Sequence, residues 1–93
     1  MTEYNYKDFL EKHDRDNHKL TVVFLKKAQE GSKVILTNNG EYEVERVVES
    51  VMKGAELKLA ESNGTIKINK NNGGLVHING NEKTDIENMT LKV

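Results

Sequence analysis

The sequence predicts a single α+β domain in which two short helices precede a small antiparallel meander of about five strands. Four of the seven glycines directly follow an asparagine, and these pairs separate short apolar runs within residues 32–93. Asn-Gly is a strong signal for tight β-turns because both residues tolerate a positive φ. Residues 1–31 instead carry apolar side chains at helical spacing. We therefore expect one domain over 1–93, with a helical part over 1–31 and a β part over 32–93.

The first helix is expected over residues 6–13. Asn5 is a suitable N-cap, and Asp8 places an acidic side chain in the first turn, where the helix dipole favours it. Helical spacing then continues at Tyr6, Phe9, Leu10 and His13. The polar segment 13–19 is expected to be a loop.

A second helix is expected over residues 22–30. Thr21 has the character of an N-cap, and Gly31 fits the position just after a helix end. The alternative is a strand over Leu20–Leu25, because this segment is rich in β-branched residues.

The first hairpin is expected to turn through a three-residue loop, Asn38-Asn39-Gly40. This loop would place Val34 opposite Val44 and Leu36 opposite Tyr42, so that apolar side chains share one face. Beyond Val44 the alternation slips, which predicts a bulge near residues 45–46 that bends the second strand. A turn is expected at residues 53–54.

The next strands follow from alternation in residues 56–60, 65–69 and 75–78. The loop between the first two of these strands stays open between a four-residue and a two-residue turn. For the following hairpin, pairing Ile66 with Ile78 and Ile68 with Val76 leaves 70–74 as a five-residue loop. Residues 81–88 are expected to form a turn or one loose helical turn, and 89–93 a last strand.

The order of loops, the bent second strand and the turn before the last strand resemble an SH3-like, partly open barrel. This resemblance concerns architecture and covers roughly residues 32–93. It implies no proline-peptide groove, since such a groove needs clustered aromatic residues and this region has only Tyr42.

Composition excludes several classes of function. The net charge is −1 and the basic residues are scattered, which disfavours a duplex-DNA binder. There is no cysteine, so no disulfide or thiolate chemistry is expected. Neither a signal peptide nor a membrane span is evident, which predicts a cytoplasmic protein with no membrane partner.

We expect neither a metal site nor catalysis, and no cofactor. The best metal candidate is the cluster at residues 13–18, with two histidines and two aspartates, but Lys19 and Leu25 stand where a calcium loop needs glycine and glutamate. His13 and His18 are five residues apart, which suits neither a helix nor a strand face. No serine lies in a recognisable nucleophile motif, and no phosphate-binding glycine motif occurs.

Two surfaces are candidates for binding another protein. The first is an acidic stripe, expected on the outer face of the second strand, consisting of Glu41, Glu43, Glu45 and Glu49. It would dock a basic partner, although a solvated face with Lys33 opposite Glu45 is the plainer interpretation. The second is an apolar set expected to point outward, consisting of Ile35, Val48 and Leu75. The helices would cover this set, or it would serve a partner or a homodimer.

These observations predict a non-catalytic protein-binding module. Eleven asparagines, twelve lysines and no proline are typical of short accessory proteins from AT-rich bacteria or their phages, so an inhibitor or adaptor of a host macromolecular machine is the specific hypothesis. The alternative is a small-ligand or nucleotide-binding protein. It would use a dimer cleft or the main-chain N–H groups of the loop Asn71, Asn72, Gly73 and Gly74.

Overall fold

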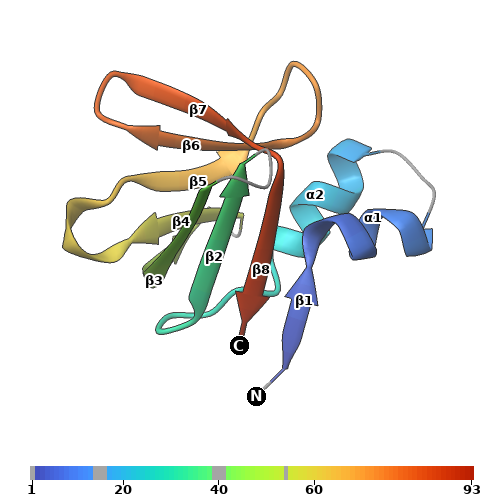
Figure 1. The fold of residues 1–93 in the computed structure, drawn as a ribbon, viewed down its shortest axis with the longest axis horizontal. Helices are drawn as coiled ribbons and strands as arrows, with labels where there is room; N and C mark the ends of the chain where they lie inside the picture. Colours follow the sequence, from blue (N-terminus) through green and yellow to red (C-terminus); the bar gives the residue numbers. More distant parts are fainter. Residues whose placement is uncertain (1, 14–16, 39–41, 54) are drawn as a thin grey trace.

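The computed structural model describes residues 2–13, 17–38, 42–53 and 55–93. Within these residues, two helices and eight strands form one compact α+β fold with a large antiparallel sheet (Figure 1). The helices are α1 (Tyr6–His13) and α2 (Asn17–Leu25), and a 3₁₀ turn spans Ala60–Ser62. The strands are β1 (Glu3–Asn5), β2 (Lys33–Asn38), β3 (Tyr42–Met52), β4 (Glu56–Leu59), β5 (Thr65–Ile68), β6 (Leu75–Asn79), β7 (Glu82–Ile86) and β8 (Asn88–Lys92).

The sheet is strongly curled but not closed. Its strand order is β1-β8-β2-β3-β4-β5-β6-β7. Only Glu87 separates β7 from β8 along the chain, yet five strands lie between them in the sheet. The sheet must therefore bend until its far edge comes round to β8, as Figure 1 shows. The α+β class is confirmed, whereas the SH3-like barrel stays a prediction and the observed strand count exceeds the predicted five.

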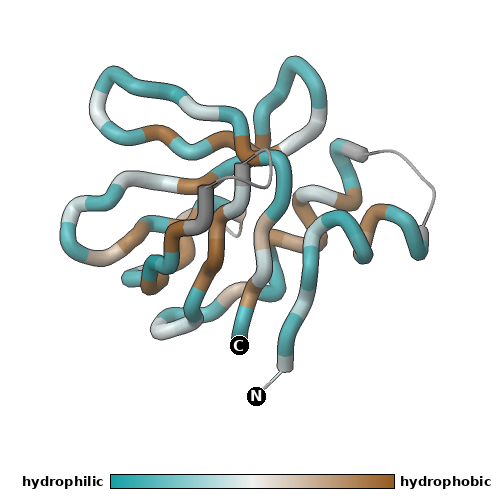
Figure 2. The backbone as a smooth tube through the Cα atoms, in the orientation of Figure 1, coloured by the Kyte–Doolittle hydropathy of each residue, from teal (hydrophilic) through white to brown (hydrophobic). Residues whose placement is uncertain are grey.

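The core fills the inside of this curl. Alternate residues of the strands point inward, so Val34 lies opposite Leu91 and Leu36 opposite Met89. Figure 2 shows the apolar segments gathered where the strands converge. The core residues are Tyr6, Phe24, Leu25, Ala28, Val34, Leu36, Val48, Leu57, Leu59, Ile66, Leu75, Ile86, Met89 and Leu91.

The helices pack on this core. Phe24 is fully buried, and its ring contacts the rings of Tyr6 and Phe9 with centroids 5.4 and 5.7 Å away. Helix α1 lies next to β1 and β8, and α2 contacts β5. The helices therefore cover the core face of the sheet, and the expected cover of a second, outer apolar face is wrong.

The predicted first helix is confirmed in extent and in its cap. The main-chain N–H of Asp8 donates to Asn5 Oδ1 at 3.2 Å, as an N-cap requires. The second helix was placed wrongly. It begins at Asn17, within the predicted loop, and ends at Leu25, so Thr21 lies inside it and is fully buried instead of capping it.

The register of the first hairpin was also wrong. Leu36 lies opposite Val44 and Val34 opposite Arg46, so the register is displaced by two residues while the inward face is preserved. The loop residues 39–41, including Gly40, lie outside the described residues. The bulge occurs between Val48 and Ser50, later than predicted, where three residues of β3 match two of β4.

The two later hairpins differ from expectation as well. In the first, Leu57 lies opposite Ile66 and Lys58 opposite Thr65, which fits neither of the two turns considered. In the next, Ile66 lies opposite His77, one residue away from the predicted Ile78. The predicted turn over residues 81–88 is wrong too, because it contains all of β7 and the beginning of β8.

Candidate ligand-binding cleft

The pairing of β5 with β6 differs from the predicted register by one residue, which exchanges the inward and outward residues of β6. Leu75 was expected to point outward, but it is buried in the core. Val76 and Ile78 take the outer positions, because successive strand residues point to opposite faces. The cause is the connecting loop. The N–H of Asn69 donates to the Gly74 carbonyl at 2.8 Å, which closes four residues between them where five were predicted.

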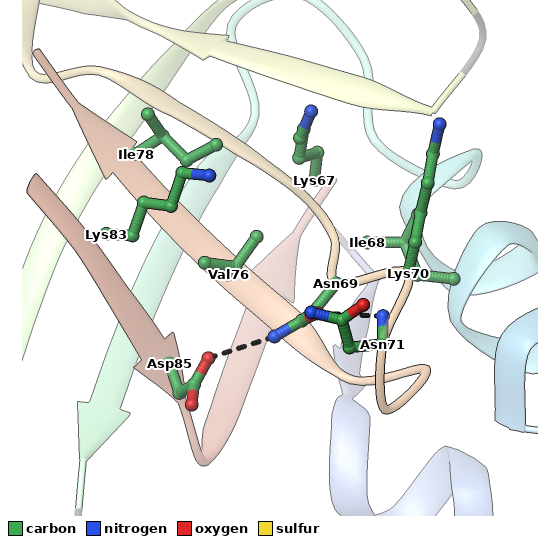
Figure 3. A pocket seen from close by; sticks show the side chains of 9 residues that line it. All are labelled: Lys67, Ile68, Asn69, Lys70, Asn71, Val76, Ile78, Lys83 and Asp85. Carbon is green, nitrogen blue, oxygen red and sulfur yellow. Dashed lines mark hydrogen bonds between the residues drawn. The ribbon is translucent and has the colours of Figure 1, made fainter. Parts of the chain in front are cut away.

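Val76 and Ile78 form the floor of a cleft on the outer face of β5, β6 and β7. The cleft has a volume of about 450 Å³. Val76 lies opposite Lys67 of β5 and Asp85 of β7, and it is only 6% exposed although it is on the outer face. The residues lining this lysine cleft are Lys67, Ile68, Asn69, Lys70, Asn71, Val76, Ile78, Lys83 and Asp85 (Figure 3).

The rim of the cleft is basic. Lys67, Lys70 and Lys83 come from β5, from the following loop and from β7. With the one carboxylate of Asp85 they give the cleft two net positive charges, in a protein whose overall charge is −1. Lysine stems can cover apolar surface while their ammonium groups stay in water. The cleft therefore combines a small apolar floor with mobile cationic groups.

Asn69 holds one end of the cleft in place. Its Nδ2 donates to Asp85 Oδ1 at 3.2 Å, and its Oδ1 accepts the N–H of Asn71 at 3.0 Å (Figure 3). This amide links the β5–β6 loop to β7 and orients the carboxylate of Asp85. The described lining residues thus supply ammonium, amide, carboxylate and apolar groups, a set suited to binding an anionic partner.

The candidate loop over residues 71–74 uses three of its main-chain N–H groups in its own hydrogen bonds. The N–H of Asn71 is used as just described, that of Gly73 donates to the Asn69 carbonyl at 2.8 Å, and that of Gly74 donates to Asn72 Oδ1 at 2.8 Å. These three donors are therefore engaged within the loop itself. The Gly73 carbonyl in turn accepts from Thr21 Oγ1 at 2.6 Å, so the loop is docked on α2.

The predicted apolar surface is not assembled. Val48 is 1% and Leu75 is 2% exposed, so their predicted outward placement is wrong and neither can touch a partner. Ile35 is half-buried on β2. Alternation placed Val48 outward because the bulge was expected before it, whereas the bulge follows it.

Two members of the acidic stripe are described in full. Glu45 and Glu49 are exposed, and their carboxylates lie 3.8 Å from Lys33 Nζ and 3.2 Å from Lys58 Nζ. Lys33 lies opposite Val47, so its contact with Glu45 is diagonal and not directly across as predicted. Glu41 and the side chain of Glu43 lie outside the described residues.

The metal-candidate cluster at residues 13–18 lies partly outside the described residues. Residues 14–16 and the side chain of His13 lie outside the described residues, and His18 Nε2 lies 3.1 Å from the Lys70 carbonyl. Among the described residues, no group of three or more His, Asp or Glu side chains is placed to hold an ion.

Comparison with protein-family models, curated proteins and solved structures found no match for this chain. In the part of the chain that the structure describes, neither helix has the length and apolar character needed to cross a membrane.

Proposed function

We propose that this protein is a non-catalytic binding module that docks an acidic segment of a partner protein in the lysine cleft. The observation that supports this most is the apolar floor of Val76 and Ile78 beneath three lysines of the rim. A volume of about 450 Å³ falls in the range of ligand clefts. It suits a few side chains of a partner better than a broad, flat interface.

Charge complementarity would act mainly on association. Opposite charges across an interface raise the rate of encounter and select among partners, and this effect weakens with salt. Lys70 and Lys83 are exposed, so their contributions should be of this kind. Contact with the floor, mainly with the half-buried Ile78, would supply the apolar part of the affinity.

The acidic stripe remains a second proposed surface, for a basic partner. Its described members Glu45 and Glu49 already lie beside Lys33 and Lys58. A basic partner would have to compete with these ion pairs, whereas an acidic partner at the lysine cleft would meet a net positive charge. The lysine cleft is therefore the preferred site.

An anionic small ligand such as a nucleotide is the second candidate for the same cleft. The side chain of Asn71 lines it, and amide and ammonium groups together are common partners of phosphate oxygens. If such a ligand binds, the loop over residues 71–74 would contact it through side chains and not through its main-chain N–H groups.

A titration with synthetic probes tests the proposal. The probe is a decapeptide with blocked ends in which glutamate and valine alternate. The control peptide has lysine in place of glutamate. Binding is followed by the ¹H–¹⁵N NMR chemical shifts of the protein. We expect shifts at β5–β7 with the acidic peptide only. The double variant Lys67→Glu/Lys83→Glu should weaken binding at least tenfold. The matched variant Lys26→Glu/Lys53→Glu has the same charge change at turns just after α2 and β3, and it should retain most of the affinity.

An equal loss of affinity in both double variants would show that only the net charge of the protein matters. That result would overturn the assignment of the lysine cleft as the binding site. Saturable binding of ATP or inorganic phosphate at the same residues, with no peptide binding, would select the small-ligand alternative. We further propose that the protein inhibits or adapts a host macromolecular machine, a hypothesis that rests on composition. An SH3-like architecture is also proposed, and it rests on the order of the loops.

A further inference from the structure

Strand β7 forms one edge of the sheet in the described part of the chain, beside the lysine cleft. It is the last strand in the sheet order, and within the described residues it pairs with β6 alone. Residues 82–85 are exposed, and only Ile86 at its end is buried. In Figure 1, β7 lies at the outside of the sheet beyond β6.

The turn before β7 determines which main-chain groups face the open edge. Gly80 and Asn81 form a two-residue turn between Asn79 and Glu82, which lie opposite each other. In such a hairpin the flanking pair exchanges both hydrogen bonds, and bonded pairs then alternate with non-bonded pairs. Glu82 and Thr84 therefore direct their N–H and C=O groups to β6.

It follows that the N–H and C=O groups of Lys83 and Asp85 point away from β6, towards the open edge. The same two residues carry the side chains that line the cleft. Two independent features thus coincide on β7: main-chain groups at the edge that pair with no other described strand, and a basic, apolar-floored cleft on the adjoining outer face.

We propose that the acidic segment binds by adding a strand to β7. This inference rests on the proposed function and specifies how the partner is held. Main-chain hydrogen bonds to an edge strand supply affinity, and alternate side chains supply specificity. Acidic side chains of the added strand would lie beside Lys83 on the cleft face, and the residues between them would lie on the opposite face of the sheet.

The charges on β7 also bear on pairing between identical chains at this edge. Short edge strands and edge lysines are common protections against such pairing. In an antiparallel pair of two β7 strands, Lys83 would lie opposite another Lys83 or opposite Asp85, depending on register. Charge opposes the first of these registers only, whereas an acidic partner strand meets Lys83 without lysine repulsion.

The test uses N-methylated versions of the glutamate–valine decapeptide with the full-length protein. One version carries methyl groups on all glutamate amides and the other on all valine amides. In an added strand only alternate amides face β7, so one version should lose binding at least tenfold and the other should bind like the parent. Loss with methylated glutamates indicates an antiparallel strand, and loss with methylated valines a parallel one.

Amide hydrogen exchange provides the second readout. On binding of the parent peptide, protection of the Lys83 and Asp85 amides should rise at least tenfold, while the Thr84 amide, already bonded to β6, should change little. Equal binding by both methylated peptides, equal loss by both, or unchanged protection at Lys83 and Asp85 would overturn strand addition. The lysine-cleft proposal would survive if the parent peptide still required Lys67 and Lys83. Failure of the parent peptide to bind at all would overturn both.

Discussion

Gly64 shows why one of the Asn-Gly turns cannot accept another residue. It has a φ of +96°, and a Cβ at this position would overlap the carbonyl oxygen of Ile78 and lie 3.0 Å from His77 Nε2. The turn packs closely against β6, where His77 Nε2 lies 2.6 Å from the Asn63 carbonyl. Because that carbonyl can only accept, the imidazole must carry its proton on Nε2.

Substituting Gly64 should therefore cost more than backbone strain alone. We expect Gly64→Ala to lower the free energy of unfolding by roughly 2–5 kcal/mol, combining left-handed strain with overpacking. The control is Gly80→Ala, since Gly80 has a φ of +63° but open space around it, and it should lose only about 1–2 kcal/mol. Urea denaturation measures both, and equal losses would mean that the contact with β6 is unimportant.

A buried chain of hydroxyl groups joins the two helices to the β5–β6 loop. Thr21 Oγ1 donates to the Gly73 carbonyl at 2.6 Å, and the Tyr6 hydroxyl lies 2.7 Å from Thr21 Oγ1. Since the single proton of Thr21 is used on Gly73, the Tyr6 hydroxyl donates to Thr21. A tyrosinate could not donate this hydrogen bond and could only accept one from Thr21, which would then give up its bond to Gly73, so the fold favours the neutral form of Tyr6.

This predicts a loss of stability in alkali. Burial raises the pKa of the Tyr6 hydroxyl above its usual 10.0. Above about pH 10 the unfolded chain loses this proton while the folded chain keeps it, so the unfolded state binds fewer protons and stability falls as pH rises towards the folded pKa. Tyr6 should contribute a slope of at most about 1.4 kcal/mol per pH unit. Denaturation at several pH values should show that Tyr6→Phe lacks this contribution. Parallel profiles for both proteins would contradict the assignment.

At the scale of elements, the sequence predicts which segments form strands better than it predicts how they pair. The alternation of Leu57 with Leu59, and of Ile66 with Ile68, locates β4 and β5 because it reflects a local period. Register depends on how many residues each loop closes, and a change of one residue turned Leu75 inward and Val76 outward. The lysine cleft was missed for this reason, since its floor was assigned to the core.

Strands β1 and β7 were missed because both are edge strands. The pattern of β7 is almost entirely polar, with only Ile86 buried, so it lacks the alternation of a half-buried strand. Strand β1 has only three residues, too few to show a period, and it forms a strand because it pairs with β8. Helix α2 began earlier than its expected cap because packing of Leu20, Phe24 and Leu25 outweighed the capping preference of Thr21.

Asn5 connects β1, α1 and β8, and its substitution tests that connection. Its Oδ1 caps α1 through the Asp8 N–H, and its Nδ2 donates to Thr90 Oγ1 at 3.1 Å. We expect Asn5→Ala to cost about 1–2 kcal/mol of unfolding free energy, mainly as a lost cap. Asn5→Ser keeps a capping oxygen and should recover part of this loss. A neutral effect of Asn5→Ala in thermal or urea denaturation would contradict the role of the cap.

At the scale of the whole molecule, the helical and β parts share one core. Phe24 and Leu25 of α2 are fully buried among strand residues. Near the N-terminus, Thr2 exchanges two main-chain hydrogen bonds with Val93, at 3.1 and 2.9 Å. Strand β1 continues this pairing along β8. Deleting the first 31 residues would thus uncover the inside of the curl and leave the edge of β8 unpaired.

We therefore expect a fragment of residues 32–93 not to fold alone. Small domains have thin cores, and truncating one buried aromatic side chain typically costs 3–5 kcal/mol out of a total of about 5–15 kcal/mol. The fragment loses Phe24, Leu25 and Tyr6 together. Its ¹H–¹⁵N NMR spectrum should be poorly dispersed and its urea unfolding should lack a cooperative transition. Adding the 1–31 peptide should restore dispersed resonances, because the missing contacts are not covalent. A fragment that unfolds cooperatively without the peptide would show that the curled sheet is stable by itself and that the helices are an addition to it.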